Sequence, residues 1–413
     1  MPETVETPQA PEAPKAGAAS RLTSHLSIGG IVAPLITLVF AFFVAGLVVL
    51  ASGADPFEIY KAIFNGAGLN WLLPWLSEDD RPLAAANLQQ TLINTGPLIL
   101  CGLAVAYAFR AGLFNIGAQG QYTVGSIIAV YVASSWAGLP GWLHVVVAMA
   151  LAALAGAAWG AIAGGLRAAT GANEVITTIM LNYTALWIGV YLFGLGGPLQ
   201  SDTQTSVPIS NDVLTDARLP VFWGDKDLQG LHVGIFVAVL AAGVFWVLLN
   251  RSRLGFEARA VGFSPPAARS SGIGVGRTYV MTMGLCGLFA GLAGSLDVLG
   301  WQFHLATNDV QTSQVGFLGI AVALLGRNTA IGTCLAALLF GALLQGTNVR
   351  NFEAGTFDPN LAPNLTTVIQ GLVVLLVSAD VLLASVWRRR RARRGAPPDA
   401  VPAPTTLGQV PTA

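Results

Sequence analysis

The sequence predicts an all-α membrane protein, a polytopic membrane helical bundle with about ten transmembrane helices. Of its 413 residues, 54% are hydrophobic and only 10% are charged, whereas a soluble globular domain is typically about 25% charged. Crossing the hydrocarbon core takes about 20 predominantly apolar residues in a helix, and ten windows near that length are bounded by charge, proline or glycine. The basic residues are also divided unequally between the two sides that these windows define.

The chain begins with residues 1–27, which are rich in proline, alanine, threonine and glutamate. This composition cannot bury a core, so we expect a disordered cytoplasmic tail. The segment does not have the form of a signal peptide, because acids rather than bases open it and the apolar run behind it is long enough to span. The transmembrane domain is predicted over 28–388.

Ten spans are predicted within this domain from the apolar runs and the residues that flank them. They run approximately over 29–52, 86–109, 113–136, 141–166, 173–195, 231–250, 278–300, 310–326, 329–348 and 365–387. The first, sixth and tenth are the most uniformly apolar. The second, third and eighth carry more polar residues, which is typical of broken or re-entrant segments.

Lysine and arginine set the orientation, because cytoplasmic loops keep an excess of them. With the N-terminus inside, 16 of the 21 basic residues face the cytoplasm and five face outward. An even number of spans returns the C-terminus to the same side, so both termini are predicted to be cytoplasmic. Residues 389–413 are interpreted as a basic and then flexible tail. Directly after an apolar span, such arginines favour membrane anchoring, and no nucleic-acid partner is expected.

The chain shows no catalytic, cofactor-binding or metal site in its sequence. Lys15, Lys61 and Lys226 are followed by Ala, Ala and Asp, so none belongs to the Gly-Lys-Ser/Thr loop that cradles nucleotide phosphates. The three cysteines and four histidines are scattered, without metal-ligand spacing. We therefore predict a membrane protein that is not an enzyme and holds no cofactor of its own.

The acidic residues Asp297 and Asp380 fall within predicted spans. An ionisable group in the bilayer is costly and often functional, which leaves open an ion-coupled secondary transporter that acts alone. Both residues lie off the centre of their spans, without an obvious cationic partner. Packing, or capping of backbone amides, is the alternative role.

The segment 112–125, "GLFNIGAQGQYTVG", is unusually polar for a predicted span. It interleaves four glycines with neutral hydrogen-bonding side chains in a stretch that has no formal charge. Such groups are tolerated at membrane depth when they line a cavity or pair inside a bundle. Candidates for the pathway of a small neutral solute are Asn115, Gln119, Gln121, Tyr122 and, further along, Asn182. Hydrogen bonding between helices is the alternative.

The three amides of this segment do not share one helix face. Asn115 and Gln119 are four residues apart and lie on the same side, whereas Gln121 points elsewhere. A helix broken at Gly117 or Gly120 would turn all three toward one cavity.

A second polar cluster consists of Asn173, Glu174, Asn182 and Tyr183. Asn173 and Glu174 lie near the cytoplasmic end of the predicted span 173–195. Capping and subunit contacts therefore compete there with contact to a solute. Asn182 is the pathway candidate of this cluster.

The longest predicted cytoplasmic loop separates the sixth and seventh spans. Within it, Ser264 is a good helix N-cap, Pro265 suits the first helical position, and Gly272 suits the residue after a helix end. These residues predict a short helix over "PPAARSS". So short a helix is marginal in isolation, which favours stabilisation by a docking surface. An ordinary basic connector near lipid head groups is the alternative.

The stretches "GLAVAYAFR" at 102–110 and "GIAVALLGR" at 319–327 share Gly-x-Ala-Val-Ala and an arginine eight residues after the glycine. The likeness hints at an internal repeat. Nine residues of small apolar composition are weak evidence for one.

Three stretches carry a family resemblance: "AYAFRAGLFNIGAQGQYTVGS" at 106–126, "ANEVITTIMLNYTALWIGVYL" at 172–192 and "GFEARAVGFSPPAARSSGI" at 255–273, with a weaker fourth at 316–346. In these the chain resembles ABC-type importer permeases of the group that carries nucleosides and simple sugars, which is related to the branched-chain amino acid and ribose permeases. "FNIGAQGQ" is the specific element. The resemblance extends from about residue 30 to 388.

The resemblance implies a permease in the plasma (inner) membrane of a prokaryote, with nucleosides as the first expected solute, simple sugars second and branched-chain amino acids third. The expected partners are the lipid bilayer, a second permease subunit, an ATP-binding subunit with two nucleotide-binding domains, which would use the ATP, and an external solute-binding protein. The loop at 255–273 is similar to the coupling helix that contacts the ATPase. The residues that match the contact motif are Glu257, Arg259, Gly262, Pro265, Ala267, Ala268 and Gly272.

Overall fold

The computed structural model describes residues 28–51, 53, 55–225, 230–348, 367–368 and 371–372. The chain divides into two units, one formed by Met1–Ala41 with Leu375–Ala413 and the other by Phe42–Val374. α3 and all the later helices and strands of the described chain lie in the second unit. The predicted tails at 1–27 and 389–413, and Asp380, lie outside the described residues.

The first two helices are separated by a sharp bend. α2 covers Ile28–Ala51 and α3 covers Pro56–Gly66, and the segments Val39–Ala51 and Pro56–Gly66 are bent by 120° relative to each other. α3 begins where its sequence dictates: the Asp55 carboxylate accepts a hydrogen bond from Phe57 N at 2.8 Å, and Pro56 occupies the first position. A 3₁₀ turn, η1, follows at Leu69–Leu72.

α4 (Arg81–Arg110) is the most buried of the long helices in the described chain. It is enclosed by four helices, α8 (Gly234–Arg251), α11 (Val275–Asp297), α13 (Val315–Leu325) and α14 (Ala330–Gly346). The three turns that precede its end consist almost entirely of buried small and apolar side chains, from Leu98 to Ala108. A helix that is apolar on all sides is expected at the centre of such a bundle.

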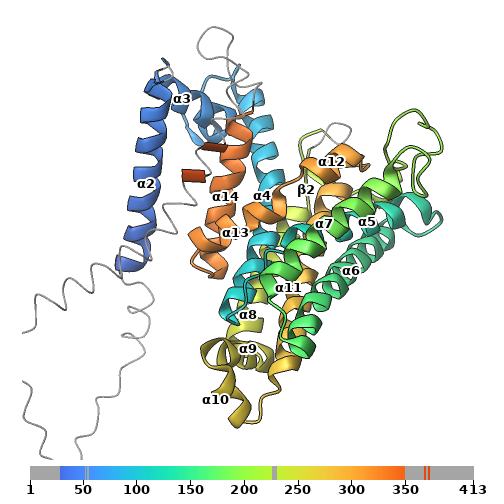
Figure 1. The fold of residues 1–413 in the computed structure, drawn as a ribbon. Helices are drawn as coiled ribbons and strands as arrows, with labels where there is room; N and C mark the ends of the chain where they lie inside the picture. The colour runs from blue at the N-terminus through green and yellow to red at the C-terminus, as the bar shows by residue number, and fades with distance from the viewer. Residues whose placement is uncertain are drawn as a thin grey trace, which may run out of the picture. The chain divides into compact units, whose positions relative to one another are not determined.

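Three further helices, α5 (Ala118–Ser135), α6 (Gly141–Thr170) and α7 (Glu174–Phe193), pack beside α11 or one another (Figure 1). α6 and α11 touch through glycines: a Cβ atom on Gly156 would lie 2.3 Å from Gly287 O, and one on Gly160 would lie 2.3 Å from Met283 O. Small residues at such spacing let two helix backbones approach closely, which is how helices associate in lipid.

The two ends of this unit differ in their elements. One end carries a hairpin of two short helices, α9 (Arg253–Phe263) and α10 (Pro265–Ser270), and α12 (Thr307–Thr312) lies at the opposite end (Figure 1). The loop between α7 and α8 contains a 3₁₀ turn, η2 (Thr215–Ala217), and two antiparallel strands, β1 (Val221–Trp223) and β2 (Leu231–His232). This loop binds by backbone hydrogen bonds, such as Ser210 N to Leu305 O at 2.9 Å, to the segment between η3 (Val298–Gln302, a π-helical turn) and α12.

The helical, polytopic fold class is confirmed, but the predicted count of ten spans is not. Among the described residues, five helices are long and apolar enough to cross a membrane, or six if the bent pair of α2 and α3 forms one span. The predicted span 310–326 is divided between α12 and α13, and 329–348 contains the 17-residue helix α14. Most of the predicted span 365–387 lies outside the described residues.

The two similar stretches at 102–110 and 319–327 lie against each other. A Cβ on Gly102 would lie 2.7 Å from a Val322 methyl carbon, and one on Gly319 would lie 2.7 Å from Cys101 Cβ. At their ends, the Arg110 guanidinium donates to the Asn328 carbonyl at 3.0 and 3.1 Å. The shared glycines therefore serve the close approach of α4 and α13.

Candidate functional site: the polar turn before α5 and the α9–α10 hairpin

The polar segment begins as a turn, because α4 ends at Arg110 and α5 starts only at Ala118. Gly112 has a φ of 68°, Gly112 N donates to Phe109 O at 3.2 Å, and Leu113 N donates to Ala108 O at 3.0 Å. This pair of bonds is a Schellman motif, in which a left-handed glycine closes a helix. We call residues 111–117 the polar turn. The predicted break is present, with Gly117 at the N-cap of α5.

The break brings Asn115 and Gln121 together. Asn115 Nδ2 donates to Gln121 Oε1 at 3.0 Å, and Gln121 Nε2 donates to Asn115 Oδ1 at 3.2 Å. Both side chains are buried. Two amides joined in this way satisfy each other without water.

The other two amide candidates bind backbone groups. Gln119 Oε1 accepts from Gly316 N, at the start of α13, at 2.9 Å. Asn182, on α7, accepts from Gly120 N at 2.8 Å and donates to Ile116 O at 3.0 Å. Asn115 and Gln121 thus join the polar turn to α5, whereas Gln119 and Asn182 join this segment to α13 and α7. Contact of the four amides with a solute stays a prediction.

Glu174 ties the same turn to the ends of α6 and α7. Its carboxylate pairs with Arg167 and accepts from Phe114 N at 3.4 Å. The Arg167 guanidinium also lies 5.0 Å from the centre of the Tyr279 ring on α11. The polar turn is thus held on its α7 side by Glu174 and Asn182.

Tyr122 connects the polar segment to the acidic residue of α11. Its hydroxyl donates to Asp297 Oδ2 at 2.6 Å, while Trp301 Nε1 donates to Asp297 Oδ1 at 2.9 Å. Both oxygens of the Asp297 carboxylate thus have donors from the protein, which matches the packing role that was one of its two predicted alternatives.

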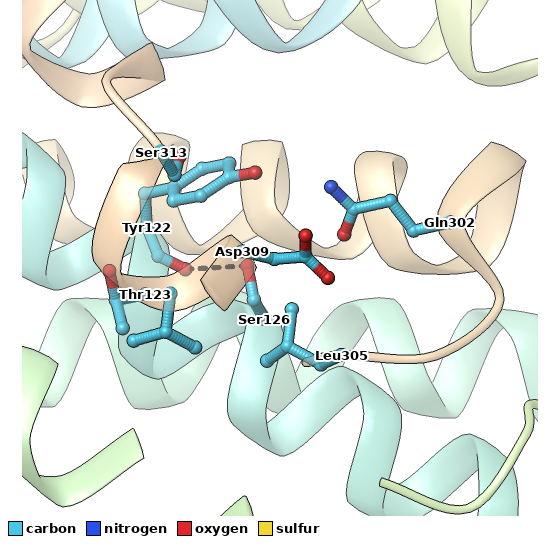
Figure 2. Close-up of a pocket in the computed structure, with 8 residues that line it drawn as sticks. Tyr122, Thr123, Ser126, Gln302, Leu305, Asp309 and Ser313 are labelled. Atoms are coloured by element: carbon cyan, nitrogen blue, oxygen red, sulfur yellow. Dashed lines mark hydrogen bonds between the residues drawn. The ribbon is translucent and has the colours of Figure 1, made fainter. Parts of the chain in front are cut away.

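Tyr122 also lines a small cavity of about 10 Å³. Figure 2 shows Gln302 and Asp309 facing this space from the segment around α12, opposite the ring of Tyr122. The remaining lining residues are Thr123, Ser126, Leu305, Val310 and Ser313. A cavity of this size and polarity holds about one water molecule.

Sequence reasoning did not single out Gln302, Asp309 and Ser313. They lie in the polar run "WQFHLATNDVQTS", which follows the predicted seventh span and overlaps the start of the eighth, and only the fold brings them to Tyr122, which is about 180 residues earlier. The polarity of that run is the sequence signal that could have identified these three residues.

The short helix predicted after Ser264 is confirmed as α10. Ser264 is its N-cap and accepts from Ala267 N at 3.4 Å, Pro265 is its first residue, and Gly272 follows it with a φ of 80°. Ile273 N donates to Ala268 O at 3.0 Å, which completes a second Schellman motif. The local sequence therefore determines this helix.

The residues that match the contact motif face in different directions. Pro265, Ala267 and Gly272 are exposed, whereas Ala268 is buried against Val261 and Val275.

The three other motif residues interact within the chain. Glu257 pairs with Arg253 at 2.6 Å, Arg259 donates to Leu249 O, and Gly262 packs against the polar turn. Of the seven motif residues, only Pro265, Ala267 and Gly272 are therefore exposed at the surface.

Sequence reasoning also missed two aromatic residues of this hairpin. Phe263, at the end of α9, is 94% exposed, and Phe256 is 60% exposed. They are seven residues apart and thus lie on the same side of α9. With Pro265 and Ala267 they form what we call the hairpin patch. Exposed apolar side chains that gather on one side of a short helix are a candidate interaction surface.

The chain is similar in sequence to known transport proteins. Residues 87–378 match the family model described as "Branched-chain amino acid transport system / permease component". The chain is 36% identical to the guanosine ABC transporter permease protein NupP of Bacillus subtilis (strain 168), over 90% of this chain and 98% of that protein. It is 30% identical to the nucleoside ABC transporter permease protein NupB of Lactococcus lactis subsp. cremoris (strain MG1363), over 88% and 94%.

A third relative carries a different solute in its name. The chain is 32% identical to the glucose ABC transporter permease protein TsgB13 of Haloferax volcanii, over 89% of this chain and 93% of that protein. No solved structure matches the chain significantly.

Proposed function

The chain belongs to the permease component family of the branched-chain amino acid transport systems, and we propose that it is the membrane permease of an ATP-driven importer of nucleosides. It is a multi-pass membrane protein and a transport subunit, not an enzyme. The names of NupP and NupB support nucleosides as the solute, and that of TsgB13 supports simple sugars as the second choice. Branched-chain amino acids, named by the family model, come third.

The observation that carries the ATP-driven mechanism is the α9–α10 hairpin. Its patch of Phe256, Phe263, Pro265 and Ala267 is exposed, while Val261 and Ala268 fix its other side to α11. An exposed apolar patch on a rigid element suits docking to another protein. We assign this patch to contact with an ATP-binding subunit that has two nucleotide-binding domains. That subunit uses the ATP, and this chain holds no cofactor.

The proposed assembly also contains a second permease subunit and an external solute-binding protein. The arginine distribution favours a plasma (inner) membrane orientation with the hairpin and both termini in the cytoplasm. In this orientation α12 and the α7–α8 loop lie at the outer end, where the solute-binding protein would dock.

We place the solute pathway beside Tyr122. Its cavity is lined by neutral polar groups, Asp309 and the apolar Leu305 and Val310, and it adjoins the segment that carries Asn115, Gln119 and Gln121. These amides, with Asn182, are proposed to lie next to the pathway and to hold its wall. Neutral hydrogen-bonding groups suit a solute with hydroxyls and a base edge.

Reconstitution tests the proposal. The chain and its partner subunits would be placed in proteoliposomes, and uptake of labelled guanosine, glucose and leucine would be measured with and without ATP. We expect ATP-dependent uptake of guanosine that a protonophore does not reduce. Uptake by the chain alone under a proton gradient, without an ATPase, would instead support the ion-coupled carrier and overturn the proposal.

A further inference from the structure

The polar turn and the α9–α10 hairpin touch through the backbones of two glycines. A Cβ on Gly262 would lie 2.7 Å from both Ala111 C and Arg110 O, and 2.8 Å from Gly112 N. A Cβ on Gly112 would lie 2.9 Å from Gly262 Cα. Real Cβ atoms do not approach other atoms this closely, so glycine is required on both sides of the contact.

Gly262 directly precedes Phe263, the more exposed of the two aromatic residues of the hairpin patch. Phe263 therefore faces the proposed ATPase, and Gly262, the residue before it, contacts the transmembrane bundle. The resemblance assigns Gly262 to the contact with the ATPase, but its backbone faces Ala111 and Gly112 in this structure.

Hydrogen bonds to α8 and an ion pair along its length hold α9 together as one rigid unit. The Arg259 guanidinium donates to Leu249 O, and Ser252 Oγ donates to Leu248 O at 2.6 Å, which ties the helix to the end of α8. Arg253 and Glu257 form an ion pair along it. A rigid element transmits displacement better than a flexible loop does.

The other side of the contact leads directly into the polar turn. Phe114, two residues after Gly112, donates its N–H to Glu174. Asn115, the next residue, bonds Gln121. Arg110, immediately before the contact, is bonded to the α13–α14 turn. α4, α5, α7 and α13 thus have an attachment within a few residues of Gly112.

We propose that Gly262 is a positioning residue, which passes displacement of the α9–α10 hairpin to the polar turn through its backbone contact with Ala111 and Gly112. The inference rests on the proposed function, because it needs an ATPase to move the hairpin. Contact between backbones leaves no side-chain rotamer to absorb the movement, so a small displacement of α9 must shift the turn or break the contact.

The test compares Gly262→Ala with Gly243→Ala, both within the assembled complex. Gly243 lies on α8, where an added Cβ has no atom within 4 Å. For Gly262→Ala we expect assembly and ATP hydrolysis close to those of the unchanged complex, with uptake per ATP reduced about 2- to 30-fold, the range for residues on a coupling network. Gly243→Ala should leave this ratio unchanged. Unchanged uptake per ATP in Gly262→Ala would overturn the proposal.

A measurement on the unchanged complex covers the case in which Gly262→Ala does not fold. Amide hydrogen exchange of residues 111–121 would be compared between the nucleotide-free complex and the complex held with a non-hydrolysable ATP analogue. We expect exchange to differ between the two states. If exchange is equal in the two states of a complex that imports solute, only the proposed role of Gly262 is overturned. Failure of any ATPase to assemble with the chain overturns the proposed function instead.

Discussion

Asn115 and Gln121 share two hydrogen bonds across the break between α4 and α5. Neither side chain has appreciable contact with solvent. A buried amide that loses its partner carries the full cost of its desolvation, whereas two apolar side chains of similar shape in the same place carry none. The pair is therefore a place where structural and transport roles can be separated.

We expect Asn115→Leu and Gln121→Leu each to lower the free energy of unfolding by about 1–3 kcal/mol, because each leaves one buried amide unsatisfied. The double variant should recover much of this loss. Thermal stability of the purified protein tests this, and uptake per folded molecule is measured beside it. If stability recovers in the double variant but uptake does not, the amides act on the solute as well. Additive losses of stability would contradict the pairing.

The Asp297 carboxylate accepts from Tyr122 and Trp301, and we expect it to serve packing. Tyr122→Phe should reduce thermal stability because it removes the donor to Asp297 Oδ2, and Asp297→Asn should reduce it because one acceptor oxygen then remains for two donors. Their combination should be no worse than the sum. ATP-driven uptake per folded Asp297→Asn molecule should persist and stay insensitive to a protonophore. Complete loss of uptake in a stable Asp297→Asn protein would favour ion coupling.

At the scale of elements, the α9–α10 hairpin has two faces with different tasks. Phe263 is exposed, whereas Ala268, only five residues later, is buried against Val261 and Val275. A new charge on each face therefore tests a different interaction.

Phe263→Asp should abolish assembly with the ATP-binding subunit while the isolated permease keeps its thermal stability, because the new charge faces water until docking. Ala268→Asp should destabilise the permease itself, by more than about 2 kcal/mol, since the carboxylate would be buried without a partner. Co-purification and thermal unfolding separate the two effects. Normal assembly of Phe263→Asp would remove this residue from the docking surface.

The contact between α6 and α11 depends on glycines at specific positions. Gly160→Ala should lower thermal stability, because its Cβ would lie 2.3 Å from Met283 O. Gly165→Ala is the matched control on the same helix, where an added Cβ has no atom within 4 Å. The control should be neutral or slightly stabilising, as alanine favours a helix over glycine by about 1 kcal/mol. Equal stability of the two variants would contradict the close crossing.

At the scale of the whole molecule, the basic residues predict that the hairpin faces the cytoplasm. A cysteine at Ser270, which is exposed on α10, should resist an impermeant thiol reagent in intact cells. A cysteine at Thr203, exposed in the α7–α8 loop, should be labelled. Both substitutions would be made in a chain without Cys101, Cys286 and Cys334. Labelling of the cysteine at position 270 from outside would reverse the proposed topology.

The sequence alone determined the features that depend on composition or on neighbours in the chain. Its apolar content and few charges predicted a helical membrane bundle, which the helices and the family confirm. Ser264, Pro265 and Gly272 predicted α10, because caps act within one helical turn. The sequence also offered Gly117 and Gly120 as places where a break would bring the three amides together, and α5 begins directly after Gly117.

Only the tertiary structure decided the features that depend on distant residues. Ala267 and Ala268 look alike in sequence, yet one is exposed and the other packs against Val275. Gly262 matches a contact motif, yet it touches a turn some 150 residues earlier. The predicted span 310–326, whose polar residues are typical of a broken segment, is divided at 313–314, and only the fold shows that Gln119 binds Gly316 N just after the division. Periodicity and composition report what one segment can do by itself, whereas these outcomes depend on which surfaces the other segments present to it.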